Sequence, residues 1–323
     1  MSTFLRIVFP LLLFLTVFPV VARTPVNFVY TTSGELDAVS SILARSDIGG
    51  AQVVYSWRSL EPEKGRYDFS QIERDLSRLQ SMHKKLFIQI QDRFFDKRAR
   101  YVPDYLLNEA MYGGGLSPQF DNPGEGKPVG SGWVAQQWNP HVRQRFQALL
   151  SALSTRFDGQ VFGVNLPETA IDLDDKKLPD GYSCDRYLIA EIDNLLFARS
   201  VFKKSHVVQY VNFWPCEWDN DHNYMGFFFE IASRNNIGVG GPDIVPGLNA
   251  QMKNSYPFFN KYKNMKTRLP LVAMAVQEAT LTYKNPKTGK PFTKQEFVNF
   301  AADYLGADII FWSTASPWLK NSH

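Results

Sequence analysis

The sequence is poor in the residues that most often build metal and redox sites. It has 2 cysteines and 5 histidines among 323 residues. The histidines form no H-x-x-x-H or H-x-H pair, so the spacing typical of a zinc site is missing. Neither cysteine has the neighbours of a metal site or of a Cys–His nucleophile. We therefore expect no metal ion and no cofactor.

Several sequence motifs are also missing. There is no G-x-S-x-G elbow of a serine hydrolase, no G-x-G-x-x-G after an early strand and no P-loop. The acidic run with Asp172, Asp174 and Asp175 lacks the spacing of an EF-hand and is interpreted as a solvated turn. The 35 basic and 32 acidic residues give a net charge of +3 and are scattered along the chain. This balance predicts no nucleic-acid partner.

The amino terminus carries the longest apolar run. One cation, Arg6, precedes residues 7–21, and the run ends on small residues at Ala22. This pattern predicts a signal peptide over residues 1–22. Pro10 and Pro19 interrupt the run, which barely reaches the roughly 20 apolar residues of a membrane span, so a retained anchor is the alternative. We expect a secreted or periplasmic protein without a stable membrane anchor after cleavage, and no lipid anchor, since no Cys follows the run.

Aromatic residues are abundant. They make up 14% of the chain, with 25 Phe, 14 Tyr and 7 Trp. A Phe-rich core accounts for most of the Phe but less well for Trp in polar loops. Because sugars present C–H faces that stack on aromatic rings, an exported chain with this composition fits carbohydrate handling.

Short apolar runs alternate with amphipathic segments along the mature chain, the pattern of βα units on a parallel sheet. Residues 23–323 are therefore interpreted as a single (β/α)8 TIM barrel, with a long insertion after strand 3 (residues 98–139) and a short or missing final helix. A doubly wound open sheet is the alternative fold. The expected strands are residues 26–30, 51–55, 86–91, 161–165, 207–213, 237–240, 271–276 and 308–312. The expected helices lie near residues 35–45, 71–83, 141–157, 186–203, 225–233, 257–265 and 294–304.

The loop after the second strand carries a recognisable motif. Residues 57–69 read W-x-x-L-E-P-x-x-G-x-Y-D-F. This run resembles the second βα loop of clan A glycoside hydrolases, especially the barrel of family-42 β-galactosidases and their relatives. The resemblance implies a catalytic barrel that hydrolyses O-glycosidic bonds of an oligo- or polysaccharide. Glu61 is interpreted as scaffolding, whereas Trp57 and Arg58 lie nearer the strand end, where they would contact substrate.

Glu168 lies after the fourth strand, where clan A enzymes carry their acid/base Glu, usually directly after an Asn. Here Leu166 and Pro167 separate Asn165 from Glu168, a departure from the family's pattern. An apolar rim raises the pKa of a carboxyl by desolvation, which suits an acid working near neutral pH. A solvated loop Glu is the alternative.

Glu278 lies after the seventh strand, where clan A enzymes carry their nucleophile. Because side chains alternate along a strand, either Gln277 or Glu278 faces the barrel mouth. Strands four and seven lie on opposite sides of the mouth, so Glu168 and Glu278 can flank one bond. The resemblance implies a retaining mechanism, with carboxyl groups about 5–5.5 Å apart.

Other strand ends supply candidate binding groups, because function in such barrels lies at the C-terminal ends of the strands. Asp92 either binds sugar hydroxyls or pairs with Arg93. Trp312 is either the Trp that clan A enzymes often place under the sugar or a core residue. The expected substrate-binding residues are Trp57, Arg58, Asp92, Asn165, Asn212, Trp214, Asp243 and Trp312.

The two cysteines follow neighbouring strands. Cys184 comes after the fourth strand and Cys216 after the fifth, which places both loops on one face of a barrel. In an oxidising compartment a disulfide between them is expected, and two unpaired thiols are the alternative.

Two other functions use the same barrel. A carbohydrate-binding barrel without catalysis is consistent with the irregular spacing before Glu168. A transglycosylase would use the same two carboxylates with a sugar acceptor in place of water. We expect a carbohydrate substrate and a monomer, and the sequence names neither the sugar nor the linkage.

Overall fold

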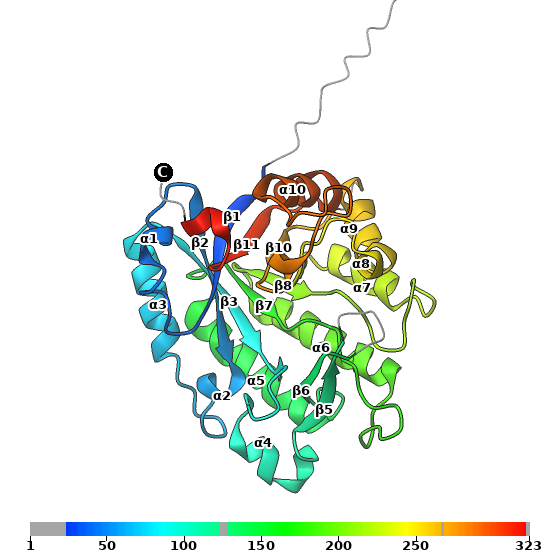
Figure 1. Ribbon diagram of the computed structural model, residues 1–323. Coiled ribbons are helices and arrows are strands. Elements are labelled where there is room, and N and C mark those ends of the chain that lie inside the picture. Colours follow the sequence, from blue (N-terminus) through cyan, green and yellow to red (C-terminus); the bar gives the residue numbers. More distant parts are fainter. Residues whose placement is uncertain (1–23, 123–127, 266–267, 321–323) are drawn as a thin grey trace, which may run out of the picture.

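The computed structural model describes residues 24–122, 128–265 and 268–320. The predicted signal peptide lies outside the described residues. Eight parallel strands close into a barrel in the order β1-β11-β10-β9-β8-β7-β3-β2, with helices around it (Figure 1). The prediction of a (β/α)8 barrel is confirmed. The strands are β1 (Val26–Thr32), β2 (Ile48–Ser56), β3 (Lys85–Gln91), β7 (Gly163–Leu166), β8 (His206–Tyr210), β9 (Gly238–Gly241), β10 (Val272–Val276) and β11 (Ile309–Ser313).

The helices match the expected segments with two differences. The first segment is helical only over α1 (Ser40–Leu43), because turns occupy most of residues 33–39. The last long segment begins as α10 (Lys294–Asn299) and continues as a π-helix over Phe300–Leu305. After β11 the described residues contain only the short α11 (Pro317–Lys320), as expected. The others are α2 (Trp57–Leu60), α3 (Ser70–Ser81), α5 (Pro140–Phe157), α6 (Cys184–Val201), α7 (Tyr224–Arg234), α8 (Asn249–Lys253), α9 (Tyr256–Lys263) and the 3-10 turn η2 (Thr280–Thr282).

The insertion after β3 forms a small antiparallel sheet in the order β4-β6-β5. Its elements are β4 (Arg93–Phe94), α4 (Asp104–Asn108), η1 (Ala110–Tyr112), β5 (Leu116–Asp121) and β6 (Gly130–Ala135). The backbone N–H of Phe120 donates to the carbonyl of Asp172 at 2.8 Å. This bond joins β5 to the loop after β7, so the insertion lies beside the barrel mouth.

The barrel interior is filled by alternate residues of the strands, as the period of two requires. The inward residues are Leu271, just before β10, Ala273 and Ala275 on β10, and Ile309 and Phe311 on β11. Gly240 faces them from β9, where an added Cβ would lie 2.0 Å from the carbonyl oxygen of Ala273. A second, larger apolar layer packs between the strands and the surrounding helices. No helix in the described ranges combines the length and apolar character needed to cross a membrane.

Candidate functional site

A cavity of about 540 Å³ lies at the C-terminal ends of the barrel strands. In this fold that face carries the loops that bind and transform substrates. Segments after β7, β8, β9 and β10 form one part of its wall, and the insertion forms the other. The lining residues are Phe95, Gln119, Phe120, Asp121, Asn122, Glu168, Ala170, Ile171, Asp172, Asn212, Phe213, Trp214, Glu217, Trp218, Pro242, Asp243, Gln277, Ala279 and Tyr283.

Glu168 lines this cavity and is half-buried. Burial raises the pKa of its carboxyl to about 7, and the nearby charges of Asp243 and Asp121 act in the same direction. The charge of Arg93 and a hydrogen bond from Asn212 oppose the rise. That bond runs from Asn212 Nδ2 to Glu168 Oε2 at 3.1 Å. The carboxyl can therefore hold or release a proton near neutral pH.

The backbone around Glu168 is held from β8 and the loop that follows it. Gln209 Nε2 donates to the carbonyl of Pro167, and the N–H of Thr169 donates to the carbonyl of Tyr210 at 3.1 Å. Thr169 Oγ1 donates to the carbonyl of Phe213 at 2.7 Å. These bonds fix the backbone on both sides of Glu168. They hold it in place although Leu166 and Pro167 separate Asn165 from Glu168.

A buried ion-pair network lies beneath Glu168. Arg93 Nη1 donates to the carbonyl oxygen of Glu168. Its guanidinium also pairs with Asp92 Oδ1 at 2.9 Å and with Glu191 Oε1 at 3.0 Å. Asp92 is 1% exposed and accepts a second bond, at 2.7 Å, from Gln137. The predicted sugar contact of Asp92 is therefore corrected to the alternative, pairing with Arg93.

Asp243 is brought close to Glu168 from the end of β9. Burial raises the pKa of its carboxyl, and Thr280 Oγ1 donates to its Oδ1 at 2.5 Å. Tyr256 donates its hydroxyl to the backbone carbonyl of Asp243 at 3.0 Å. Two half-buried carboxyl groups, Glu168 and Asp243, thus share one cavity, and the charge of Asp243 disfavours ionisation of Glu168.

At the end of β10, Gln277 continues the inward series Leu271, Ala273, Ala275 and lines the cavity. Glu278 is exposed and lies outside the lining. Its Oε1 accepts a hydrogen bond of 2.5 Å from Ser313 Oγ, and Ser313 follows Ile309 and Phe311 in the inward register of β11. Glu278 therefore stands at the rim, above the ends of β10 and β11.

Carboxylates from both sides of the barrel mouth affect the pKa of Tyr30. Burial raises the pKa of Tyr30 to about 12, with further contributions from the charges of Glu278, Glu168 and Asp243. All three carboxylates therefore act on the same phenol at the end of β1. Sequence reasoning missed Tyr30, although it has the same strand register as the interior residue Phe28.

Of the predicted substrate-binding residues, Asn212, Trp214 and Asp243 line the cavity with Glu168. Asn165 points inward below the mouth, is fully buried and donates to the carbonyl of Leu166 at 3.0 Å. It holds the strand end rather than a ligand.

Two predicted tryptophan contacts are wrong because both side chains face the helix layer. Trp57 is 0% exposed and donates to Glu61 Oε2 at 2.9 Å. Trp312 is also 0% exposed and donates to Asn27 Oδ1 at 2.8 Å. Arg58 is exposed but lies outside the cavity lining, paired with Asp104 at 2.7 Å.

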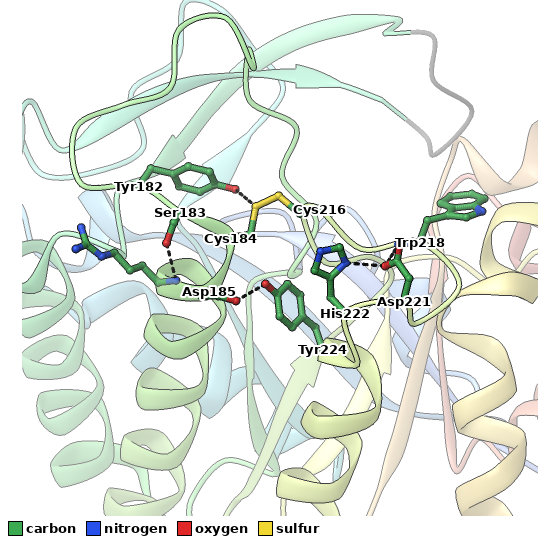
Figure 2. Close-up of a disulfide and its surroundings, with 10 residues drawn as sticks. Tyr182, Ser183, Cys184, Asp185, Cys216, Trp218, Asp221, His222 and Tyr224 are labelled. Atoms are coloured by element: carbon green, nitrogen blue, oxygen red, sulfur yellow. Dashed lines mark hydrogen bonds and ion pairs between the residues drawn. A yellow bond between two sulfur atoms is a disulfide. The ribbon is translucent and has the colours of Figure 1, made fainter.

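The predicted disulfide between Cys184 and Cys216 is confirmed, with a Cα–Cα distance of 6.1 Å. Figure 2 shows it joining the start of α6 to the loop before α7. That loop carries Trp214 and Trp218 into the cavity wall. Within the described residues, no group of three or more His, Cys, Asp or Glu side chains could hold a metal ion.

No family model matches the sequence, and no curated protein matches it. Solved structures do match the fold. The catalytic domain of β-amylase from Paenibacillus polymyxa is 7% identical, with a TM-score of 0.59 over 91% of this chain and 93% of that one. Xylanase A of P. fluorescens subsp. cellulosa, in complex with xylopentaose, is 11% identical with a TM-score of 0.53, over 93% and 90%. A psychrophilic glycoside hydrolase family 10 endo-β-1,4-xylanase is 9% identical with a TM-score of 0.52, over 90% and 85%. At these identities the similarity establishes the barrel fold.

Proposed function

We propose that this protein is an exported glycoside hydrolase that cleaves O-glycosidic bonds of an oligo- or polysaccharide by a retaining mechanism. The observation that carries the proposal is the carboxyl of Glu168, whose pKa burial raises to about 7 in a cavity at the catalytic face of the barrel. Such a carboxyl still holds its proton near neutral pH and can protonate a poor leaving group. The named activities of the structures with the same fold support this class of reaction.

In the proposed reaction, Glu278 is the nucleophile and Glu168 the general acid/base. Glu278 attacks the anomeric carbon, the bond to the leaving oxygen breaks, and Glu168 gives that oxygen its proton. Glu168 then takes a proton from water, whose oxygen displaces Glu278 from the anomeric carbon. The hydrogen bond from Ser313 to Glu278 Oε1 leaves the second carboxylate oxygen for the attack.

A carbohydrate-binding barrel without hydrolysis is the second candidate. One observation favours it: Gln277, an amide, continues the inward series of β10 and lines the cavity, whereas Glu278 stands outside the lining. An amide in the nucleophile's place would bind sugar hydroxyls and leave the glycosidic bond intact.

The test compares the mature protein with its Glu168→Gln, Glu278→Gln and Asp243→Asn variants on a panel of polysaccharides and aryl glycosides. Glu168→Gln should lower kcat about 10²- to 10⁴-fold on substrates with poor leaving groups and far less on dinitrophenyl glycosides, which need no acid. A 2-deoxy-2-fluoro glycoside should become covalently attached to the peptide containing Glu278. Label on Asp243 instead would reassign the nucleophile. Sugar binding without turnover on any substrate would support the binding barrel.

A further inference from the structure

The side of the cavity around Glu168 has an aromatic rim. Phe95, Phe120 and Trp218 line the cavity, yet they remain 46%, 38% and 40% exposed. Trp218 stacks on Phe213 with the ring planes 2° apart and the centroids separated by 6.2 Å. Exposed rings gathered from β4–β6 and the loop after β8 provide flat apolar faces for a ligand.

The same wall is acidic. Five carboxylates line the cavity and, among the described residues, no Lys, Arg or His does. The Glu217 carboxylate already has hydrogen-bond partners, since it accepts from the backbone N–H groups of Tyr224 and Met225 at the start of α7. The Asp172 carboxylate accepts a hydrogen bond from Asn122 Nδ2 at 2.8 Å.

Asp121 differs from the other carboxylates. It stands on β5 beside the aromatic rim, half-buried, and burial raises the pKa of its carboxyl. No residue that the structure describes donates a hydrogen bond to that carboxyl. Among the described residues its negative charge therefore lacks a partner, in a wall that already holds Glu168 and Asp243.

Two further polar groups at the cavity have no hydrogen-bond partner in the part of the chain that the structure describes. Gln119 is 2% exposed, and its Oε1 accepts no hydrogen bond, while its Nε2 donates to the carbonyl of Trp133 at 3.0 Å. Trp214 is also 2% exposed, and its Nε1 donates no hydrogen bond. Buried polar groups are usually hydrogen-bonded, so an acceptor and a donor are left unsatisfied beside this cavity.

We propose that this side of the cavity binds a sugar with a free amino group, its apolar face on Phe120 or Trp218 and its ammonium beside Asp121. The inference rests on the proposed function, since Glu168 as the acid stands on the leaving-group side of the bond, which makes this subsite the leaving-group subsite. An ammonium supplies the charge and the donors that the wall lacks. A uronate or sulfated sugar would add a like charge to carboxylates already held in low-dielectric surroundings.

The test measures binding to the Glu168→Gln variant by calorimetry at about pH 5.5, where the sugar amine is protonated. The probes are oligomers of glucosamine, N-acetylglucosamine, glucose and glucuronate of equal length, with the same set in the galacto series. Acetylation removes the charge and keeps the ring, so each acetylated oligomer is the matched control. The amino oligomer of one series should bind about fivefold tighter than its acetylated form, and added salt should reduce the difference.

Asp121→Asn, added to the same background, should abolish the preference, and Asp175→Asn, an exposed carboxylate outside the lining, should preserve it. The unfolding temperature of each variant reports whether it is folded, and the salt dependence tests the charge without any substitution. Equal or tighter binding of acetylated, neutral or uronate oligomers overturns the inference. If the wild type hydrolyses neutral oligomers and no others, the proposed function is upheld and the inference is rejected. A preference for amino oligomers without hydrolysis by the wild type upholds the inference and rejects the hydrolase.

Discussion

Replacing Glu168 by Gln should make the protein more stable above neutral pH. The ordinary pKa of the side chain, 4.5, applies to the unfolded chain, and burial raises it to about 7 in the folded protein. The folded state therefore binds the proton more tightly than the unfolded state. Stability from this group is fully present below about pH 4.5 and is lost as the pH rises through about 7. Glutamine keeps the shape of the protonated carboxyl and never ionises, so the stability of the variant does not fall with pH for this reason.

The magnitude follows from the two pKa values. At about 1.4 kcal/mol per pKa unit, the stability of the wild type should fall relative to Glu168→Gln by about 2.5 kcal/mol between pH 5 and pH 8. A change of this size should appear as a difference of about 4 °C in Tm for a protein of this length.

The assay is urea unfolding of both proteins at the two pH values, followed by fluorescence and by far-UV circular dichroism. Coincident curves are required, since a free energy of unfolding is defined only for a two-state transition. Asp175→Asn serves as the control, because an exposed carboxylate should change stability equally at both pH values. If the stabilisation by Glu168→Gln differs by less than about 0.5 kcal/mol between pH 5 and pH 8, the carboxyl is not desolvated in solution and the reasoning is wrong.

Three further predictions address the surroundings of the site. Asn212→Ala removes a hydrogen bond that stabilises the Glu168 carboxylate, so the pKa should rise and the alkaline limb of a kcat/KM–pH profile, near 7 in the wild type, should move to higher pH. Cys184→Ser opens a disulfide with a sequence separation of 32 residues, and urea unfolding should show a loss of about 3–4 kcal/mol; an unchanged midpoint under matched conditions would contradict it. Arg145→Met leaves the fully buried Glu61 carboxylate without its ion pair, which should cost about 3 kcal/mol or more, whereas Glu63→Gln, an exposed neighbour, should change unfolding little.

The barrel could be predicted from the sequence because each strand and helix has its own local pattern. Eight short apolar runs and intervening segments with a helical period are sufficient to give the order of a parallel barrel. The same reasoning placed Glu168, Asn212, Trp214 and Asp243 at the C-terminal ends of the barrel strands, since each follows a strand. All four line the cavity.

The direction of a side chain at a strand end was harder to predict. It depends on the parity of the register, which the apolar runs alone do not reveal, because strands of a covered barrel are apolar on both faces. On β11 the inward residues are Ile309 and Phe311, so Trp312 faces the helices. The same parity on β10 places Gln277 inward and leaves Glu278 to reach the rim beyond the strand.

The insertion could not be assigned a role from sequence. Phe95, Phe120 and Asp121 lie in a segment without a sustained period, and they reach the cavity only because β5 bonds to the loop after β7. That contact joins residues about 50 positions apart, and no local preference specifies it. The surroundings of Glu168 are therefore largely a product of tertiary packing.

The network beneath Glu168 explains how its carboxyl keeps a raised pKa beside a guanidinium. A lone Arg93 in contact with this segment would strongly favour the carboxylate form of Glu168. Asp92 and Glu191, however, both pair with Arg93, and two negative charges outweigh the single positive one. The attraction that Arg93 exerts on Glu168 is thereby reduced, so burial and the charge of Asp243 determine the direction of the shift. Asp92, predicted from sequence as a sugar ligand, thus supports the proposed chemistry by offsetting the positive charge that would otherwise favour the deprotonated form of Glu168.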